Sequence, residues 1–229
     1  MRNLKFTIVL LFLSMFFGSV INAQDWPNLA RYREENVKIG IPANGENRVV
    51  FMGNSITEGW GPTGTGYFAG KPYINRGISG QTTPQMLLRF RQDVIDLKPA
   101  VVVIEAGTND IAGNTGPETL EMIKDYIISM AQLAKANQIK VVLCSLLPVF
   151  DYPWKPGIEP AEKIFTLNTM LKKYADENKI VYLDYYTHMV DDRKGFKAEL
   201  SGDGVHPNKN GYAIMFPLVE AAITKAISL

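Results

Sequence analysis

The sequence predicts an α/β fold, with a parallel sheet between two layers of helices in a three-layer α/β/α sandwich. Short apolar runs alternate along the chain with longer amphipathic segments. Residues 101–104 and 141–143 contain only Val, Ile and Leu. These runs are apolar on both faces, as strands buried between two helical layers must be. Strands that alternate with helices are typical of a doubly wound parallel sheet.

About five parallel strands are expected. The apolar runs that predict them lie at 48–52, 73–75, 101–105, 140–146 and 180–184. No internal repeat, low-complexity tract or long linker divides these runs. We therefore expect one domain over 48–229, preceded by an irregular lead-in at 24–47.

The amphipathic segments predict four helices. In the first, Thr83 supplies an N-cap and Pro84 the first helical position, after which apolar residues recur every three or four positions. Pro117 is expected to open the second helix and Pro160 the third. The last is expected over about 208–227.

The first 23 residues have the pattern of a signal peptide. Arg2 and Lys5 precede an almost wholly apolar run over 6–20, and the small residue Ala23 precedes a polar stretch. A transmembrane anchor is the alternative, but a span needs about 20 apolar residues and this run is shorter. We expect cleavage after Ala23, a soluble mature chain with no stable membrane insertion, and export to the periplasm or the cell exterior.

The composition excludes several classes of protein. The 24 basic residues almost balance the 23 acidic ones, so a polybasic nucleic-acid binder is not expected. One cysteine excludes a fold held together by disulfides. Two histidines and that cysteine leave little for a zinc site, and we expect neither a metal nor a cofactor.

Four polar, glycine-bearing loops follow predicted strands or precede the last helix. They lie at 53–57, 76–81, 106–110 and 202–207. In an open α/β sheet, ligands bind beyond the carboxyl ends of the strands. The loops are therefore expected to meet at one edge of the sheet and to form an active site there.

The side chains in these loops suit acyl transfer. Ser55 needs a base to become a nucleophile, and histidine is the side chain best placed for that near neutral pH. His206 needs an acid to orient its ring, and Asp203 lies three residues earlier. Backbone amides at glycines and the side-chain amide of Asn109 can donate to the oxyanion of a tetrahedral intermediate.

The four loops resemble the blocks of the SGNH (GDSL) hydrolase superfamily, which is named for Ser, Gly, Asn and His. The matching segments are 53–55, 77–80, 107–110 and 203–207, in family order. The resemblance implies a nucleophilic Ser55 with Asp203 and His206 as acid and base. It implies an oxyanion hole formed by the amides of Ser55 and Gly80 and the side chain of Asn109. It also implies a flavodoxin-like sheet with strand order 2-1-3-4-5.

One block departs from the family pattern. Asn54 stands where most members have Asp. Since this position is not one of the four catalytic types, the departure bears on the family label more than on the chemistry.

Three aromatic residues near these loops are candidates for a substrate wall: Trp60, Tyr67 and Trp154. Each could equally pack within its own domain. The same two alternatives apply to the loop at 148–160, which could be a lid over the site or a fixed structural loop.

Four other features are not expected to carry chemistry. Cys144 lies in an apolar run and is read as a buried hydrophobic residue. His188 has no acid three residues before it, and Asp110 is expected to shape its loop. Residues 59–64 spell GxGxxG, but they do not join a strand directly to a helix.

These observations predict an exported serine esterase that hydrolyses short-chain esters, including the O-acetyl groups of carbohydrates. The substrate would be a small ester or an acetylated glycan. Two alternatives remain open: a lysophospholipase or thioesterase acting on lipid acyl groups, and a non-catalytic glycan-binding module on the same fold.

Overall fold

The computed structural model describes residues 24–61 and 66–229. The predicted signal peptide at 1–23 lies outside these residues. Within the described ranges, no helix has both the length and the apolar character needed to cross a bilayer.

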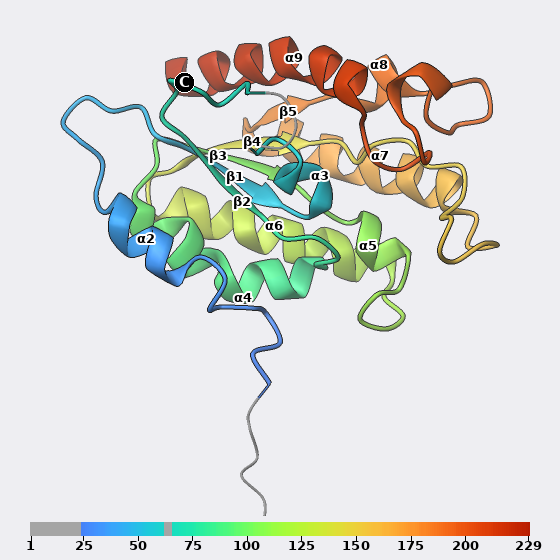
Figure 1. The fold of residues 1–229 in the computed structure, drawn as a ribbon, viewed down its shortest axis with the longest axis horizontal. Helices are drawn as coiled ribbons and strands as arrows, with labels where there is room; N and C mark the ends of the chain where they lie inside the picture. The colour runs from blue at the N-terminus through green and yellow to red at the C-terminus, as the bar shows by residue number, and fades with distance from the viewer. Residues whose placement is uncertain (1–23, 62–65) are drawn as a thin grey trace, which may run out of the picture.

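A five-stranded parallel sheet forms the middle layer, in the order β2-β1-β3-β4-β5 (Figure 1). This confirms the predicted strand order. The strands are β1 (Val49–Gly53), β2 (Tyr73–Gly77), β3 (Val101–Glu105), β4 (Lys140–Cys144) and β5 (Val181–Leu183). Gly53 at the end of β1 is in register with Gly77 of β2 and Glu105 of β3. The loops that follow these three strands therefore start side by side.

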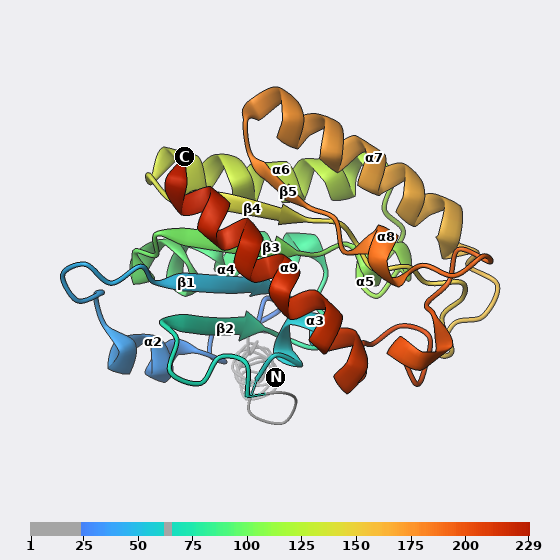
Figure 2. The same cartoon turned by 90° about the horizontal axis from the view of Figure 1, so that it is seen from above.

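Helices cover both faces of the sheet (Figure 2). One face carries α4 (Thr83–Asp93), α6 (Leu120–Ala136) and α7 (Pro160–Asn178), and the other carries α9 (Lys209–Ser228). Alternate residues of β1 point to opposite faces, as a strand's period of two requires. Val50 and Met52 pack in the core beneath α4 and α6, whereas Val49 and Phe51 pack beneath α9.

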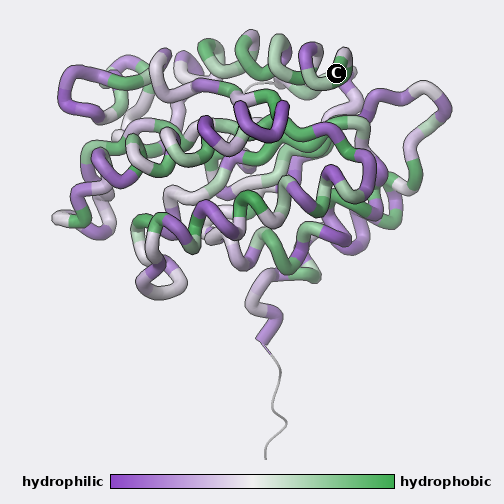
Figure 3. Tube along the Cα trace, turned by 180° about the vertical axis from the view of Figure 1, so that it is seen from behind, coloured by the Kyte–Doolittle hydropathy of each residue, from purple (hydrophilic) through white to green (hydrophobic). Residues whose placement is uncertain are grey.

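The hydropathy of the chain follows these layers (Figure 3). The strands β1, β3 and β4 are hydrophobic over most of their length, whereas the edge strand β2 contains Asn75 and Arg76 and the covering helices alternate between hydrophobic and hydrophilic residues. This is the pattern of a sheet buried on both faces by amphipathic helices.

Short helical segments occur where no helix was predicted. They are the helices α3 (Ser55–Glu58), α5 (Thr108–Ile111) and α8 (Tyr186–Met189), and the 3-10 turns Ile95–Leu97 and Ala198–Leu200. The segments α3, α5 and α8 each follow the end of a strand, so they belong to the edge of the sheet where the polar loops meet.

The prediction of an irregular lead-in at 24–47 is wrong in part, because α2 (Arg33–Ile39) lies within it. This helix has no buried residue and therefore shows no apolar periodicity in the sequence. Polar contacts hold it instead: Asn36 Nδ2 donates to Asp93 Oδ1 on α4 (2.8 Å), and Arg76 Nε donates to Asn36 Oδ1 (2.9 Å).

Two predicted helix starts also shift. The N-cap of α4 is Thr82 rather than Thr83, and its backbone N–H donates to the side chain of Gln85 (3.1 Å). The second helix begins at Leu120 rather than at Pro117, because Thr119 is its N-cap. Thr119 Oγ1 accepts the N–H of Met122 (3.2 Å).

Candidate active site

Ser55 lies at the carboxyl end of β1, where it is the first residue of α3. The N-cap is Asn54, whose side-chain oxygen accepts the N–H of Ile56 (2.9 Å). An amide oxygen makes this bond as a carboxylate would, so the Asn at this position keeps the turn. A Cβ at Gly53 would lie 2.5 Å from the carbonyl oxygen of Glu105, and therefore only glycine allows this close approach.

The structure brings together the three residues predicted as nucleophile, base and acid. Ser55 Oγ lies 2.9 Å from His206 Nε2, and His206 Nδ1 lies 2.7 Å from Asp203 Oδ2. The serine and the histidine are 151 residues apart in sequence, and the sheet edge brings them within hydrogen-bond distance. The result is a continuous hydrogen-bonded chain from hydroxyl to imidazole to carboxylate.

Asp203 is held as a carboxylate facing the ring. Its Oδ1 accepts the backbone N–H groups of Val205 (2.9 Å) and His206 (2.8 Å). Burial acts to raise the pKa of Asp203, but the hydrogen bonds from the backbone and ring of His206 outweigh it and lower the pKa to about 2. An ionised Asp203 favours the tautomer with its proton on Nδ1, which leaves Nε2 free to accept the Ser55 proton.

Ser201, which was not predicted from the sequence, also belongs to this turn. Its hydroxyl donates to the carbonyl of His206 (2.8 Å) and accepts the N–H of Gly204 (2.9 Å). These bonds close the turn that places the acid and base side by side. A serine two residues before an aspartate is typical of such turns, and this is the feature that could have revealed it.

The predicted oxyanion donors have N–H groups available for a ligand. Gly80 has φ +79°, a conformation that favours glycine, and a Cβ built there meets no atom within 4 Å. Within the described ranges, the backbone N–H groups of Ser55 and Gly80 have no hydrogen-bond acceptor. Asn109 is buried and donates one N–H to the carbonyl of Gln81 (2.9 Å), which leaves its second N–H for a ligand.

A fully buried arginine links these loops from below. Arg89 of α4 donates to the carbonyl of Gly53 (3.0 Å), to Gln81 Oε1 (2.6 Å) and to Asp93 Oδ2 (3.0 Å). It thus joins the end of the nucleophile strand to the loop that carries Gly80. Arg89 is not among the residues predicted from the sequence, although its position on the predicted helix, four residues before an aspartate, is typical of an ion pair.

Two carboxyl groups support the oxyanion loops. Asp110 accepts the N–H of Thr83 (2.8 Å) and so joins the loop of Asn109 to the start of α4, in agreement with the predicted shaping role. Burial raises the pKa of Asp110 to about 7. Glu58 accepts the N–H of Ser79 (3.0 Å) and holds the loop that carries Gly80.

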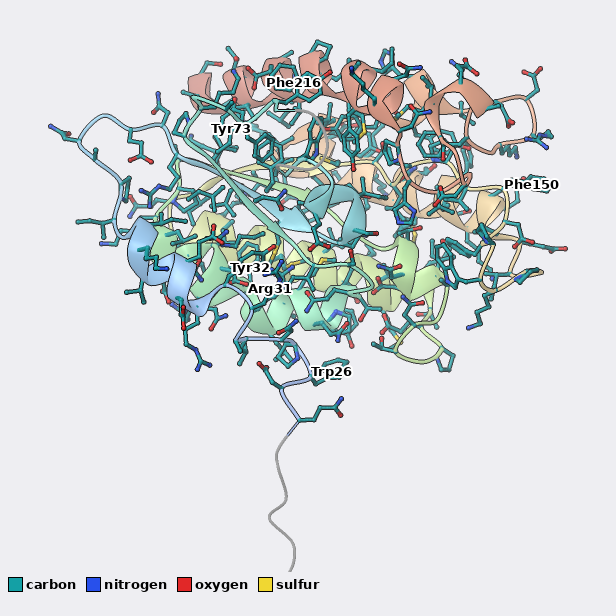
Figure 4. All side chains as sticks on the ribbon, in the orientation of Figure 1. Trp26, Arg31, Tyr32, Tyr73, Phe150 and Phe216 are labelled. Atoms are coloured by element: carbon teal, nitrogen blue, oxygen red, sulfur yellow. The ribbon has the colours of Figure 1, made fainter. Side chains whose placement is uncertain are left out.

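The three candidates for a substrate wall have different positions. Trp60 is only 3% exposed and packs edge-on against Tyr212 of α9 (centroids 4.8 Å apart), so its prediction as a wall residue is wrong. Tyr67 stacks on Phe216 of α9 (4.4 Å) in the same aromatic cluster. Figure 4 shows Phe216 beside Tyr73 beneath α9. Trp154 is 48% exposed, and its ring lies 6.3 Å from that of His206.

The loop at 148–160 is bonded to the loop that carries Asn109. The buried Tyr152 donates its hydroxyl to the carbonyl of Thr108 (2.8 Å), and Lys155 Nζ donates to the carbonyl of Ala112 (2.7 Å). The Asp151 carboxylate accepts the N–H of Gly157 (3.0 Å) within the loop. These bonds favour the fixed structural loop over the lid.

The remaining sequence-predicted features lie away from this chemistry. Cys144 is fully buried, and burial raises the pKa of its thiol, which disfavours the thiolate. His188 is exposed on α8. In the ranges that the structure describes, no three His, Cys, Asp or Glu side chains gather as a metal site would require.

Comparison with known proteins agrees with this geometry. The sequence profile of the GDSL-like lipase/acylhydrolase family matches residues 51–214, which contain all four loops of the site. The crystal structure of a GDSL-like lipase from Bacteroides thetaiotaomicron is 50% identical in sequence. It superposes with a TM-score of 0.84 over 87% of this chain and 98% of that one.

Two curated relatives are acetylxylan esterases. The Xylanibacter ruminicola enzyme is 30% identical over 222 residues, which is 80% of this chain and 45% of that protein. The present chain thus spans less than half the length of this relative. The Geobacillus stearothermophilus enzyme is 26% identical over 207 residues, which is 78% of this chain and 93% of that protein.

Proposed function

The chain belongs to the GDSL-like lipase/acylhydrolase family, and we propose that it hydrolyses short-chain carboxylic esters through an acyl-enzyme on Ser55. The observation that carries this proposal is the chain of hydrogen bonds from Ser55 Oγ through the His206 ring to the Asp203 carboxylate. The nucleophile is bonded to the base, and the base is bonded to the acid that orients it.

In acylation, Ser55 Oγ attacks the ester carbonyl while His206 Nε2 accepts the hydroxyl proton. The imidazolium is stabilised by Asp203, which is ionised at neutral pH. The ester C–O bond then breaks, and His206 returns the proton to the departing alkoxide. In deacylation, water attacks the acyl-enzyme with His206 again as base, and the carboxylic acid leaves.

The oxyanion that forms in both steps is stabilised by three N–H donors. These are the backbone amides of Ser55 and Gly80 and the side chain of Asn109. Because these donors are fixed before the substrate arrives, they stabilise the developing charge without reorganisation. The bonds of Arg89, Asp110 and Glu58 to the loops supply that rigidity.

A short acyl group on a carbohydrate is the substrate that the site favours. Gly80 is exposed and has no side chain, and the nearby Ser79, Asn114 and Thr115 are exposed and polar. A long acyl chain would find no apolar wall in these residues. The side chains of His206 and Asp203 are 39% and 46% exposed, so the site is open enough for a large alcohol. The two acetylxylan esterase relatives support the same choice.

The apolar segment at 6–20 and the small residue Ala23 support the further proposal that the chain is exported. The measurement is the N-terminal sequence of the protein recovered from a secreting host. A mature N-terminus at Gln24 is expected, and retention of Met1 would contradict the proposal.

The test of the hydrolase function uses Ser55→Ala and His206→Ala, with Ser129→Ala as a matched control. Ser129 lies on α6, where its hydroxyl donates only to the carbonyl of Asp125 (2.7 Å). Both site variants should lose turnover of a small acetate ester and labelling by a fluorophosphonate probe, and the control should keep both. Full activity in either purified site variant would refute the assignment.

The same assays separate the two alternatives. Absence of Ser55-dependent labelling, together with binding of glycans, would favour a non-catalytic binding module. Rates that rise from acetate to laurate esters would favour a lipid acylhydrolase.

A further inference from the structure

Trp154 is an exposed aromatic side chain beside the catalytic base. Its ring centroid lies 6.3 Å from that of His206, with an angle of 34° between the two planes. Nearly half of the side chain is open to solvent. A large aromatic surface left open at an active site has a hydrophobic driving force to be covered by a ligand.

The position of Trp154 is fixed from beneath. Its ring packs on that of Tyr152 (5.2 Å), and Tyr152 is fully buried with its hydroxyl bonded to Thr108. The next residue, Lys155, is bonded to Ala112 on the neighbouring loop. A ring held in this way loses little conformational entropy when a ligand covers it.

The reaction itself determines which part of the substrate reaches Trp154. The oxygen of the leaving alcohol must come within about 3 Å of His206 Nε2 to receive its proton. The acyl oxygen points instead to the amides of Ser55 and Gly80. The alcohol portion of the ester therefore lies on the His206 side of the site, where Trp154 is found.

We propose that Trp154 is a stacking platform for the pyranose ring of the leaving alcohol, and that it selects acetylated glycans among acetate esters. This inference rests on the hydrolase function proposed above. One face of a pyranose carries C–H groups with partial positive charge, which suit the electron-rich face of an indole. The hydroxyls at the ring edge stay in water because the site is open.

This role has a specific kinetic consequence. Once the sugar has left, every acetate ester gives the same acetyl-enzyme on Ser55. Trp154 therefore contributes to binding and acylation, which kcat/KM reports, and not to deacylation. For a substrate whose alcohol is too small to reach the ring, kcat/KM should not depend on Trp154.

The experiment compares Trp154→Ala and Trp154→Phe with the wild type on two substrates. One is a monoacetylated methyl β-xylopyranoside, and the other is methyl acetate, followed by acid release at constant pH. For Trp154→Ala, kcat/KM should fall about tenfold on the xyloside and change less than about twofold on methyl acetate. Trp154→Phe should restore most of the loss because phenylalanine retains an aromatic face.

Phe150→Ala is the matched control. Phe150 belongs to the same loop and is 55% exposed, but its side chain points outward at the edge of the molecule (Figure 4), near Arg193. This variant should keep wild-type rates on both substrates.

Each remaining outcome separates the two proposals. An equal loss on both substrates would show that Trp154 only supports the loop, and no loss on the xyloside would show that the sugar does not contact it. A loss that phenylalanine does not restore would also exclude stacking. Wild-type hydrolysis of methyl acetate without hydrolysis of the xyloside would overturn the platform and leave the hydrolase function intact. Hydrolysis of neither ester would instead contradict the hydrolase function.

Discussion

Replacement of Arg89 by methionine should destabilise the protein strongly, because this buried ion pair also connects two loops of the site. Arg89 and Asp93 are four residues apart on α4, joined at 3.0 Å, and both side chains are completely buried. Methionine has a similar length and can fill the space of the arginine stem. What the variant loses is therefore mainly the charge and three hydrogen bonds.

The size of the destabilisation depends on how well Asp93 is compensated once Arg89 is removed. Removal of one partner of a buried ion pair costs about 3–5 kcal/mol, since the other charge is left uncompensated. Asp93 keeps two amide donors, from Asn36 and Gln92, which places the cost towards the lower end. The side-chain oxygen of Gln81 also loses the Arg89 donor, whereas the carbonyl of Gly53 keeps one donor, the N–H of Ile78 (3.1 Å). We expect a loss of about 3 kcal/mol in the free energy of unfolding, or roughly 6–12 °C in Tm.

The assay is chemical unfolding followed by intrinsic fluorescence, with Lys172→Met as the control. Lys172 and Asp176 form an ion pair of the same spacing and order on α7, at 2.8 Å, but their side chains are 57% and 62% exposed. An exposed pair of this kind contributes about 0.3–0.5 kcal/mol. The two variants therefore differ in burial while sharing helix geometry.

Equal destabilisation in the two variants would refute the reasoning, because burial would then not decide the value of the pair. A loss below about 1 kcal/mol in Arg89→Met would refute it as well. Under conditions where Arg89→Met is fully folded, its kcat should also be lower than that of the wild type. Unchanged turnover would show that the bonds to Gly53 and Gln81 do not hold the catalytic loops in place.

Three further predictions concern single side chains. Asn109→Ala should lower kcat for acetate esters about 10²–10³-fold, since it removes one oxyanion donor. It should also lower the free energy of unfolding by about 1–3 kcal/mol, because the carbonyl of Gln81 loses its donor. A loss in kcat below about threefold would remove Asn109 from the hole. Asp203→Asn should lower kcat by orders of magnitude. In acid titrations the wild type should lose the stabilisation from Asp203 as pH falls from its ordinary pKa of 3.8 through about 2, and the asparagine variant should lack that component. Glu105 is buried with both carboxyl oxygens unpaired, and burial raises its pKa from 4.5 to about 8. Below about pH 4.5 Glu105 is protonated in both the folded and the unfolded chain, so it causes no loss of stability with pH. Between about pH 4.5 and pH 8 the free energy of unfolding falls by about 1.4 kcal/mol per pH unit, because only the unfolded chain ionises there. The non-titrating Glu105→Gln should therefore gain stability over the wild type from pH 5 to pH 8, and a constant difference in unfolding free energy would contradict this.

The exposure of the aromatic candidates could not be predicted from residue type and sequence position. Trp60 and Trp154 both lie in segments that follow the end of a strand, and the sequence alone does not distinguish their environments. Trp60 is buried because Tyr212 and Phe216, more than 150 positions later, pack over it from α9. Trp154 is open because its neighbours Tyr152 and His206 touch only part of the ring. Local sequence carries no information about which distant element will cover a side chain.

The sequence by itself determined the layers of the fold and the residue types of the site. Strands buried on both faces must be apolar throughout, and a serine, a histidine and an aspartate at strand ends are expected to meet at one edge of a parallel sheet. The tertiary structure alone decided which contacts hold these catalytic residues in position. Arg89, Ser201 and α2 act through polar contacts with residues distant in the chain or with backbone groups, and these contacts leave no periodic trace in the sequence. Apolar burial repeats with the period of the helix or strand, whereas a hydrogen bond depends on the position of one partner that only the folded chain supplies.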